Sequence, residues 1–467
     1  MSRTAAVRSA TASGIFGALL GASALAAVPG GPVLQAVVAY DGAVPTVAGV
    51  HVIASLRTLH MEVVRGDAAA LRRLATVPGV RGVAPDDAVQ LTSGDDGHDS
   101  EQQGVLASQG LGGRAGQPGA GAGVRIAVVD TGVSDTRALD RASGRLVDAA
   151  DASKVGDGRP VETGGTYTDG YGHGTFMAGI VAGGAVRGTG GKALGVAPGA
   201  TVLVVRVAKK DGSISLSRVL GGLDWVAAHP GDVDVVNLSL SHVRPHDAYG
   251  PDPLTDAVEQ VRDAGVTVVV SAGNKRGSVG DPGFDPRVLT VGAADLERGK
   301  VAPFSGSADV LGVAKPEVVA SGVDVLGLLP PGSVIAKADG TRHLDDGLFR
   351  GSGTSQATAV TSGVAALFLA ANPGATPSQV KASLRCAATG IKGKGSGAGL
   401  VRATTTVCAG PDGQALDGSG DATGETGFDA SAWAARQWSA SAWAASAWAA
   451  SAWAASAWAE QSWGEGS

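Results

Sequence analysis

Residues 124–132 of the 467-residue chain have the sequence Val-Arg-Ile-Ala-Val-Val-Asp-Thr-Gly. The nearly continuous apolar run from Val124 to Val129 is typical of a strand that is buried on both faces of a parallel sheet. Asp130 follows at the carboxyl end of this strand, which is where open α/β sheets have their functional sites. The segment therefore predicts a fold class and the position of a site within it.

Similar apolar runs recur along the chain and alternate with helix-like stretches. We expect further strands at 200–207, 233–240, 266–270 and 288–291, and helices at 173–182, 217–228, 255–264 and 357–370. Strands that alternate with helices in this way predict an α/β fold, in which helices cover both faces of a parallel sheet.

The composition suits a compact domain with many tight turns. Charged residues make up 17% of the chain and hydrophobic residues 44%, and 73 residues are glycine. The formal net charge is −6, so the sequence provides no basic stripe for a nucleic acid and no polybasic patch for a membrane surface. We therefore expect no nucleic-acid partner.

The amino-terminal segment has the features of a secretory signal. Arg3 and Arg8 precede an apolar stretch of small residues at 14–27, and Ala24-Leu25-Ala26 has the small-x-small pattern of a cleavage site. We interpret residues 1–27 as a signal peptide and expect the protein to be secreted or associated with the cell wall. A short amino-terminal anchor is the alternative.

Residues 28–91 have the pattern of a small α+β module. Residues 33–40 are expected to form a strand, Asp67 to cap the helix that follows it, and residues 80–83 to form another strand. We expect a ferredoxin-like fold for this module. The stretch 92–119, rich in Gly, Gln and Ser, is interpreted as a cleavable linker.

Three short segments carry an acid, a base and a hydroxyl in that chain order. Asp130 precedes Thr-Gly, His173 lies within Gly-His-Gly-Thr, and Ser355 lies within Gly-Thr-Ser-Gln-Ala. A serine hydroxyl needs a base to become nucleophilic, histidine can accept and return the proton, and a carboxylate can orient the imidazole. Each residue also has an ordinary alternative, a turn for Asp130 and a helix cap for the other two. Together they predict acyl-transfer chemistry.

These segments resemble the active-site segments of the subtilisin-like serine proteases, and the resemblance covers residues 120–410. It implies a subtilisin-like peptidase domain over this range and a secreted endopeptidase with Asp130, His173 and Ser355 as its triad. The module at 28–91 resembles the propeptide of this family, which implies that it assists folding, inhibits the enzyme and is removed. We expect protein or peptide substrates, the chain's own propeptide as inhibitor, and a monomer.

The resemblance also assigns residues around the triad. Asn274 matches the position that presents an amide to the oxyanion, although taken alone it would be a turn residue after a strand. The two expected walls of the substrate pocket are Ser239, Leu240 and Ser241, and Ser271, Ala272 and Gly273. Ser241 stands where the family usually has Gly, which favours a small to medium apolar P1 side chain such as Leu or Ala.

No cofactor is expected to be required. Asp140 falls near the position of a calcium-binding Asp in the family, but the partner loop does not match. Calcium therefore stays an open alternative without a clear site, and we predict no metal ligands. The two cysteines, Cys386 and Cys408, are expected to form a disulfide in an exported protein, with two buried free thiols as the alternative.

The carboxyl-terminal segment differs from the rest of the chain. Residues 411–430 form a polar linker, and a Ser-Ala-Trp-Ala-Ala pattern repeats over residues 431–467. Its tryptophans are Trp433, Trp438, Trp443, Trp448, Trp453, Trp458 and Trp463. A five-residue period builds no single face on a helix or a strand, so the tail is either a mobile low-complexity segment or a multivalent contact with cell wall, polysaccharide or protein.

Two other functions remain open on the sequence. One is a cell-wall or surface-binding protein in which the tail at 431–467 is the main functional part. The other is an ester hydrolase with the same fold. The intact triad and Asn274 argue against a catalytically dead carrier of the tail.

Overall fold

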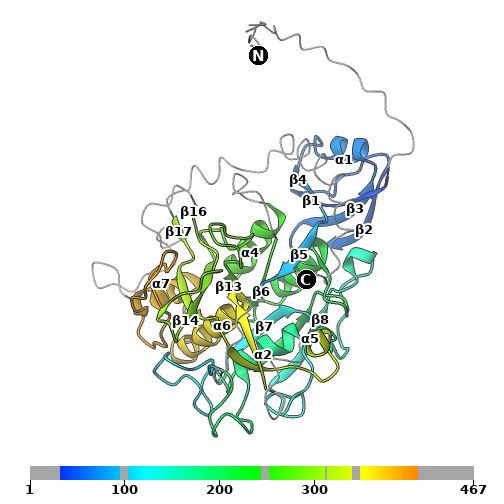
Figure 1. Ribbon diagram of the computed structural model, residues 1–467. Helices are drawn as coiled ribbons and strands as arrows, with labels where there is room; N and C mark the ends of the chain where they lie inside the picture. Colours follow the sequence, from blue (N-terminus) through cyan, green and yellow to red (C-terminus); the bar gives the residue numbers. More distant parts are fainter. Residues whose placement is uncertain (1–31, 95–103, 243–251, 311–312, 339–347, 409–467) are drawn as a thin grey trace, which may run out of the picture.

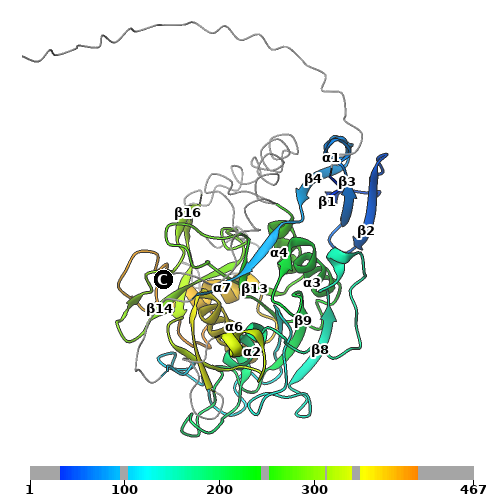
Figure 2. The ribbon, with the colours of Figure 1, turned by 45° about the vertical axis from the view of Figure 1, so that its right-hand side comes forward.

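The computed structural model describes residues 32–94, 104–242, 252–310, 313–338 and 348–408 (Figure 1). In these ranges the chain forms a large α/β domain and a small amino-terminal module at one end of it (Figures 1 and 2). The expected signal peptide at 1–27, the linker at 411–430 and the repeat tail at 431–467 lie outside the described residues and stay predictions.

The large domain is built on a sheet of eight strands. The strand order is β15-β14-β13-β11-β7-β9-β8, and β18 pairs with β14 beside this path. All pairs are parallel except that between β14 and β15, which confirms the predicted α/β class. The strands are β7 (Arg125–Asp130), β8 (Leu146–Asp151), β9 (Thr201–Arg206), β11 (Val235–Leu238), β13 (Thr267–Ser271), β14 (Leu289–Asp295), β15 (Lys300–Val301) and β18 (Val318–Ser321).

Successive residues of the central strands enter two separate cores. Along β7, Ile126 and Val128 belong to the core on one face of the sheet, and Ala127 and Val129 belong to the core on the other. All four side chains are fully buried. Side chains of a strand alternate between the faces of a sheet, so an unbroken apolar run requires that both faces be covered.

Helices provide that cover on both faces. The helices α2 (His173–Ala182) and α6 (Thr354–Ala371) contribute to one core, and α3 (Leu216–Ala228) and α4 (Pro253–Asp263) contribute to the other. The described part of the domain also contains η1 (Val155–Asp157), α5 (Val334–Ala338) and α7 (Pro377–Ala387). By length and composition α6 could cross a membrane, but 83% of its apolar window is buried, as in the core helix of a folded domain.

Within the described residues, the large domain has three smaller sheets. They have the strand orders β10-β5-β12, β19-β20-β6 and β16-β17. The strands are β5 (Ala88–Leu91), β6 (Ser93–Gly94), β10 (Ile214–Ser215), β12 (Leu240–Ser241), β16 (Ala308–Val310), β17 (Val313–Lys315), β19 (Val325–Leu328) and β20 (Leu348–Gly353). Because β5 and β6 precede the domain in sequence, the segment 88–94 is built into sheets of the domain that follows it.

The small module is an antiparallel sheet with one helix. It contains β1 (Leu34–Tyr40), β2 (Val50–Leu56), β3 (Met61–Gly66), α1 (Ala68–Leu74) and β4 (Val80–Pro85), in the strand order β2-β3-β1-β4. Oδ1 of Asp67 accepts a hydrogen bond from N of Ala70 at 2.7 Å, so Asp67 caps α1 as expected. A ferredoxin-like unit has a further helix after its first strand, but here residues 41–49 form a loop.

The sheet of the module packs on α3 and α4. Its inner face carries Val37 and Met61 into the same core as these two helices, whereas α1 covers its outer face. At the start of α3, Oδ1 of Asp86 accepts a hydrogen bond from N of Ser217 at 2.6 Å, and a carboxylate is favourable at that end of a helix. The module and the domain therefore share one hydrophobic core.

The segment expected as a linker packs on the large domain over residues 104–119. Ala107 and Leu111 are buried in its main core, and Val105 forms an isolated β-bridge with Val325. The linker prediction is wrong over this range, because isolated apolar residues among glycines produce no periodic pattern.

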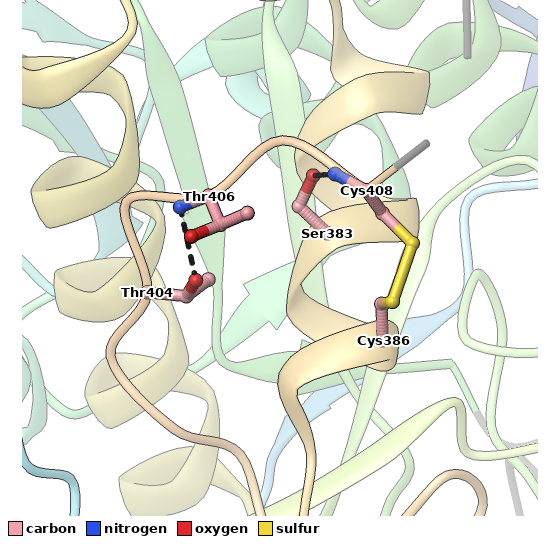
Figure 3. Close-up of a disulfide and its surroundings, with 5 residues drawn as sticks. All are labelled: Ser383, Cys386, Thr404, Thr406 and Cys408. Carbon is pink, nitrogen blue, oxygen red and sulfur yellow. Dashed lines mark hydrogen bonds between the residues drawn. A yellow bond between two sulfur atoms is a disulfide. The ribbon is translucent and has the colours of Figure 1, made fainter. Parts of the chain in front are cut away.

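A disulfide joins Cys386, at the end of α7, to Cys408 (Figure 3). Their Cα atoms are 6.3 Å apart. Oγ of Ser383, one helical turn before Cys386, accepts a hydrogen bond from N of Cys408 at 3.0 Å. The expected pairing is thus present in this structure, and it ties the last described residues to α7.

A buried group of charges lies beside β14 and β18. Oε1 of Glu317 is 2.6 Å from Nζ of Lys315 and 2.9 Å from Nζ of Lys381, and Oε2 accepts a hydrogen bond from N of Thr290 at 2.8 Å. The side chains of Lys315 and Glu317 have no exposed surface. Burial acts to raise the pKa of Glu317, but the two ammonium groups outweigh it and hold this pKa below its ordinary value.

Glu317→Gln is expected to lower the free energy of unfolding by about 3–5 kcal/mol at neutral pH, because it removes the carboxylate that pairs with two buried ammonium groups. The folded-state pKa of Glu317 lies below the unfolded value, so its contribution is present above the unfolded pKa and is lost as the pH falls through the folded pKa. Urea unfolding at neutral and acidic pH measures both effects.

The matched control is Glu162→Gln, which removes an exposed pair with Lys154 and is expected to change stability by about 0–1 kcal/mol. Similar losses in the two variants would contradict the stabilising role of Glu317.

Candidate active site

The carboxyl end of β7 and the amino end of α2 bring Asp130 and His173 together. Nδ1 of His173 lies 2.7 Å from Oδ1 and 2.8 Å from Oδ2 of Asp130. Both side chains are almost completely buried. The carboxylate fixes the orientation of the ring and leaves Nε2 as the nitrogen available for proton transfer.

Thr131 and Gly132 follow this strand directly, and Thr131 is hydrogen-bonded to the first turn of α2. Oγ1 of Thr131 accepts a hydrogen bond from N of Gly174 and donates one to Oδ1 of Asp169, both at 2.8 Å. Gly132 has a φ of 98°, and a Cβ atom there would lie 2.7 Å from two backbone carbonyl oxygens. A glycine is therefore needed at position 132 for the backbone to turn here.

Asp169 organises the loop before His173. Its Oδ1 accepts hydrogen bonds from N of Tyr171 at 3.0 Å and N of Gly172 at 2.7 Å, and its Oδ2 accepts from N and Oγ1 of Thr175, both at 2.8 Å. Burial raises the pKa of this carboxyl, and the hydrogen bonds act against that shift. Because glycine occupies the N-cap position of α2, Asp169 provides the acceptor that this helix end needs.

Ser355 is the second residue of α6 and lies at the same edge of the sheet. Its Oγ donates to O of Ser239 at 3.1 Å and lies 2.7 Å from Oγ1 of Thr92. Nε2 of His173 is buried, and within the described part of the chain it has no hydrogen-bond partner. A direct bond between Ser355 and His173 therefore requires a side-chain movement that changes the present hydrogen bonds of Ser355.

Asn274 lies three residues after β13 and contacts the start of α6. Its Oδ1 accepts hydrogen bonds from N of Thr354 at 2.9 Å and from Oγ1 of Thr354 at 2.8 Å. These bonds orient the amide so that Nδ2 donates to O of Thr92 at 2.6 Å. Thr354 therefore positions the donor that the sequence analysis assigned to Asn274.

A segment of the chain itself lies against Ser355. The strand β5 pairs in antiparallel fashion with β10 and β12, and β6 pairs in the same fashion with β20. Thr92 lies between β5 and β6, and its N donates to O of Ser239 at 3.3 Å. Residues 88–94 are thus held through main-chain bonds, as an extended peptide is held when it adds a strand to a sheet edge.

The carbonyl oxygen of Thr92 accepts two hydrogen bonds. One comes from Nδ2 of Asn274 at 2.6 Å and the other from N of Ser355 at 3.3 Å. The second donor belongs to the first turn of α6, where backbone N–H groups have no partner within the helix. Two donors aimed at one carbonyl oxygen can stabilise negative charge that develops on it.

Of the six residues predicted to form the pocket walls, Ser239 and Ser271 contact Thr92, and Leu240 and Ser241 pair with Leu91 and Gln90 of the same strand. Ser239, Leu240 and Ser241 flank the bound strand, and Ser271, Ala272 and Gly273 lead from β13 to Asn274. Oγ of Ser239 turns away from the bound strand toward O of Ser355, at 3.2 Å. Oγ of Ser271 accepts a hydrogen bond from Oγ1 of Thr92 at 2.8 Å.

Asp140 and a separate cluster of His242, Asp252 and Asp281 carry side-chain atoms that can bind metal ions. Oδ1 of Asp140 accepts a hydrogen bond from N of Ser143 at 2.7 Å within a turn. Among the described residues, His242, Asp252 and Asp281 each have a donor atom within 4.8 Å of the others, and all three are buried. The sequence assigns His242 no role, because its neighbours are unlike those of His173.

Three further residues of the site were missed by the sequence analysis: Thr92, Asp169 and Thr354. Thr92 was placed at the start of a linker. The signal that would have found it is the strand-like Ala88-Val89-Gln90-Leu91, directly before a stretch rich in Gly and Asp. The contacts of Asp169 and Thr354 follow no pattern in the sequence.

The fold and the site together define an α/β protein with an acid, a base and a serine at the carboxyl edge of a parallel sheet. Comparison with protein families then identifies the group. The model of the subtilase family matches residues 121–418, and the chain belongs to this family.

Several named proteins are similar to this chain. The serine protease AprX of Bacillus subtilis is 35% identical over 288 residues, which are 58% of this chain and 62% of AprX. Subtilisin DY of Bacillus licheniformis is 31% identical over 277 residues, which are 58% of this chain and 85% of that protein. Fervidolysin of Fervidobacterium pennivorans has a TM-score of 0.60 at 22% identity, over 81% of this chain and 61% of its own, and shares the fold. The chain therefore spans less than two thirds of AprX and of fervidolysin.

Asp169→Asn is expected to lower the free energy of unfolding by about 1–3 kcal/mol, because an amide offers one acceptor oxygen where the carboxylate uses two. Chemical denaturation measures the loss. Asp211→Asn is the matched control, since the exposed Asp211 accepts both of its bonds from Ser213 on one oxygen, and it is expected to stay within about 0.5 kcal/mol of the unmodified protein. Equal stability of the two variants would rule out this role of Asp169.

Proposed function

We propose that the protein is a secreted serine endopeptidase, in which Ser355 is the nucleophile, His173 the general base and acid, and Asp130 the residue that orients the imidazole. The observation that carries this proposal is the position of Thr92. Its carbonyl oxygen lies 2.6 Å from Nδ2 of Asn274 and 3.3 Å from N of Ser355. A peptide carbonyl held by two donors beside a serine is bound as a substrate would be.

In the proposed reaction, the side chain of Ser355 rotates toward Nε2 of His173, which accepts its proton as Oγ attacks the peptide carbonyl carbon. Nδ2 of Asn274 and N of Ser355 stabilise the negative charge on the carbonyl oxygen. His173 then returns the proton to the departing amine, and the C–N bond breaks to leave an ester on Ser355. Water, activated by the same imidazole, cleaves this ester.

Asp130 is proposed to stabilise the imidazolium that forms during each of these transfers. Its carboxylate is buried against Nδ1 of His173, where a counter-charge acts more strongly than in water. The reaction uses side chains and backbone of the chain alone, so the proposed function assigns no step to a cofactor.

The first bond cleaved is proposed to be Thr92–Ser93 of the chain itself. The strands β5 and β6 hold the backbone on either side of this bond. Residues 28–92 would then act as an inhibitory propeptide, because the same contacts keep the cleaved strand in the cleft. The core that the module shares with α3 and α4 supports a role in folding, since long-range parallel pairing forms slowly.

The experiment compares secreted wild type with Ser355→Ala by intact mass and amino-terminal sequencing. Wild type is expected to yield a fragment that ends at Thr92 and a mature chain that begins at Ser93. The variant is expected to keep the two parts joined, because it lacks the nucleophile. The mature wild type is expected to hydrolyse casein.

The matched control is Thr361→Val, a second buried hydroxyl of α6, whose Oγ1 donates to O of Ala357 at 2.9 Å. It is expected to be cleaved as wild type is. Cleavage of Ser355→Ala at the same bond would refute self-processing, and a mass that ends elsewhere would refute the assigned bond. If mature wild type did not hydrolyse casein, the peptidase function itself would be refuted.

We propose that Ser241 limits the depth of the P1 pocket. A Cβ atom at Gly280 would lie 2.5 Å from Cβ and 2.8 Å from Oγ of Ser241, so the two residues are in close contact. A Cβ atom at Gly273 would lie 3.8 Å from the same Oγ. The serine side chain therefore occupies space between two glycines near the wall of the pocket.

Ser241→Gly is expected to raise kcat/KM for peptides with Leu or Phe at P1, relative to Ala at P1, by about tenfold, the usual effect of room for one or two more methylene groups. A peptide series that differs at P1 alone measures this ratio. A ratio unchanged from wild type would show that Ser241 does not limit the pocket.

A further inference from the structure

The side chain of Thr92 makes a contact that an apolar P1 residue would lack. Thr92 is 4% exposed, and its Oγ1 donates a hydrogen bond to Oγ of Ser271 at 2.8 Å. Ser271 is the last residue of β13 and has no exposed surface. A hydroxyl bound here is therefore removed from water, where a missing hydrogen-bond partner is costly.

The second hydrogen bond of Ser271 determines which hydroxyl donates in the contact between Thr92 and Ser271. Oγ of Ser271 donates its own proton to O of Leu240 at 3.2 Å. Because that proton is already used, Ser271 offers lone pairs and acts as an acceptor toward the pocket. A P1 side chain that carries an O–H group satisfies this acceptor, whereas valine, which has the same shape as threonine, leaves it without a donor.

The contact of Thr92 with Ser355 is compatible with catalysis. Oγ1 of Thr92 lies 2.7 Å from Oγ of Ser355, and either atom can be the donor. Since the threonine proton is used on Ser271, this contact leaves Oγ1 of Thr92 as an acceptor, and Ser355 can place its single proton either here or on O of Ser239, at 3.1 Å. When Ser355 turns toward His173, Oγ1 of Thr92 no longer contacts Oγ of Ser355, but its own proton stays bonded to Oγ of Ser271. The P1 hydroxyl therefore does not hold the nucleophile in place.

The other residues of the bound strand indicate which substrate side chains fit on the amino-terminal side of P1. Val89, which would be P4, is 5% exposed and lies in the core that contains α3 and α4. Leu91, at P2, is half-buried against the same core, whereas Ala88 and Gln90 are exposed. Apolar side chains therefore contact the protein at P2 and P4, and a polar one does so at P1.

We propose that the protease prefers protein substrates with a small hydroxylated residue, threonine or serine, at P1 after aliphatic residues at P4 and P2, and that Ser271 is the residue that selects the hydroxyl. This inference rests on the proposed peptidase function. The proposal replaces the apolar P1 preference expected from the sequence with a hydroxylated one. The reason is Oγ of Ser271, which contacts Thr92 in the folded chain, a contact that the sequence does not reveal.

The test uses the mature enzyme and four peptides, Val-Gln-Leu-Xaa followed by a common leaving group, with Thr, Val, Ser or Ala as Xaa. Wild type is expected to cleave the Thr peptide with kcat/KM about 3- to 10-fold above the Val peptide, and the Ser peptide similarly above the Ala peptide, the usual worth of one buried hydrogen bond. In Ser271→Ala both ratios are expected to fall to about one. Ser278→Ala, which removes an exposed hydroxyl bonded to O of Lys275, is the control and is expected to keep both ratios.

Two outcomes overturn the inference while the peptidase function stands. In the first, wild type cleaves the Val and Ala peptides as well as their hydroxylated counterparts; this measurement needs no variant and so does not depend on the folding of Ser271→Ala. In the second, Ser271→Ala keeps the wild-type ratios. If wild type cleaves none of the peptides and a fluorophosphonate does not label Ser355, the peptidase function fails and the inference fails with it.

Discussion

The carboxyl edge of the parallel sheet is the constraint on which the rest of the structure depends. Parallel strands need crossover connections, so strands end and helices begin along one common edge. β7 brings Asp130 to this edge, α2 brings His173, and α6 brings Ser355. Both faces of the sheet are covered by packed helices, and a close-packed interior holds the buried Asp130–His173 pair in one geometry.

The strand that fills the cleft connects this geometry to the proposed function. Main-chain pairing of β5 with β10 and β12 accepts many sequences, because it uses backbone groups that every residue but proline has. Selection must therefore come from side chains such as those of Val89 and Thr92, which are buried in the complex. In the proposed function, a segment held in this way would be both the first substrate and an inhibitor of later ones, since both roles use the same contacts.

Most of the fold was predictable because its core segments are long and consistently apolar. The helix predicted at 173–182 has the bounds of α2, and the strands expected in the sheet are present with small shifts at their ends. Residues 104–119 were not predictable, since Ala107 and Leu111 are single apolar positions among glycines. The ferredoxin-like expectation for the small module assumed a helix where residues 41–49 form a loop.

The sequence by itself determined which residues can do chemistry: Asp130, His173, Ser355 and Asn274 each lie in a short segment whose strand, glycine turn or helix start is encoded locally. Only the tertiary structure decided what they meet. Thr92 contacts Ser271 across 179 positions and Ser355 across 263, and Thr354 orients Asn274 across 80. Local sequence patterns encode the direction of the backbone over a few residues, whereas such contacts depend on how distant segments pack. That Thr92 lies beside Ser355, and that its hydroxyl donates to Ser271, is therefore seen only in the folded chain.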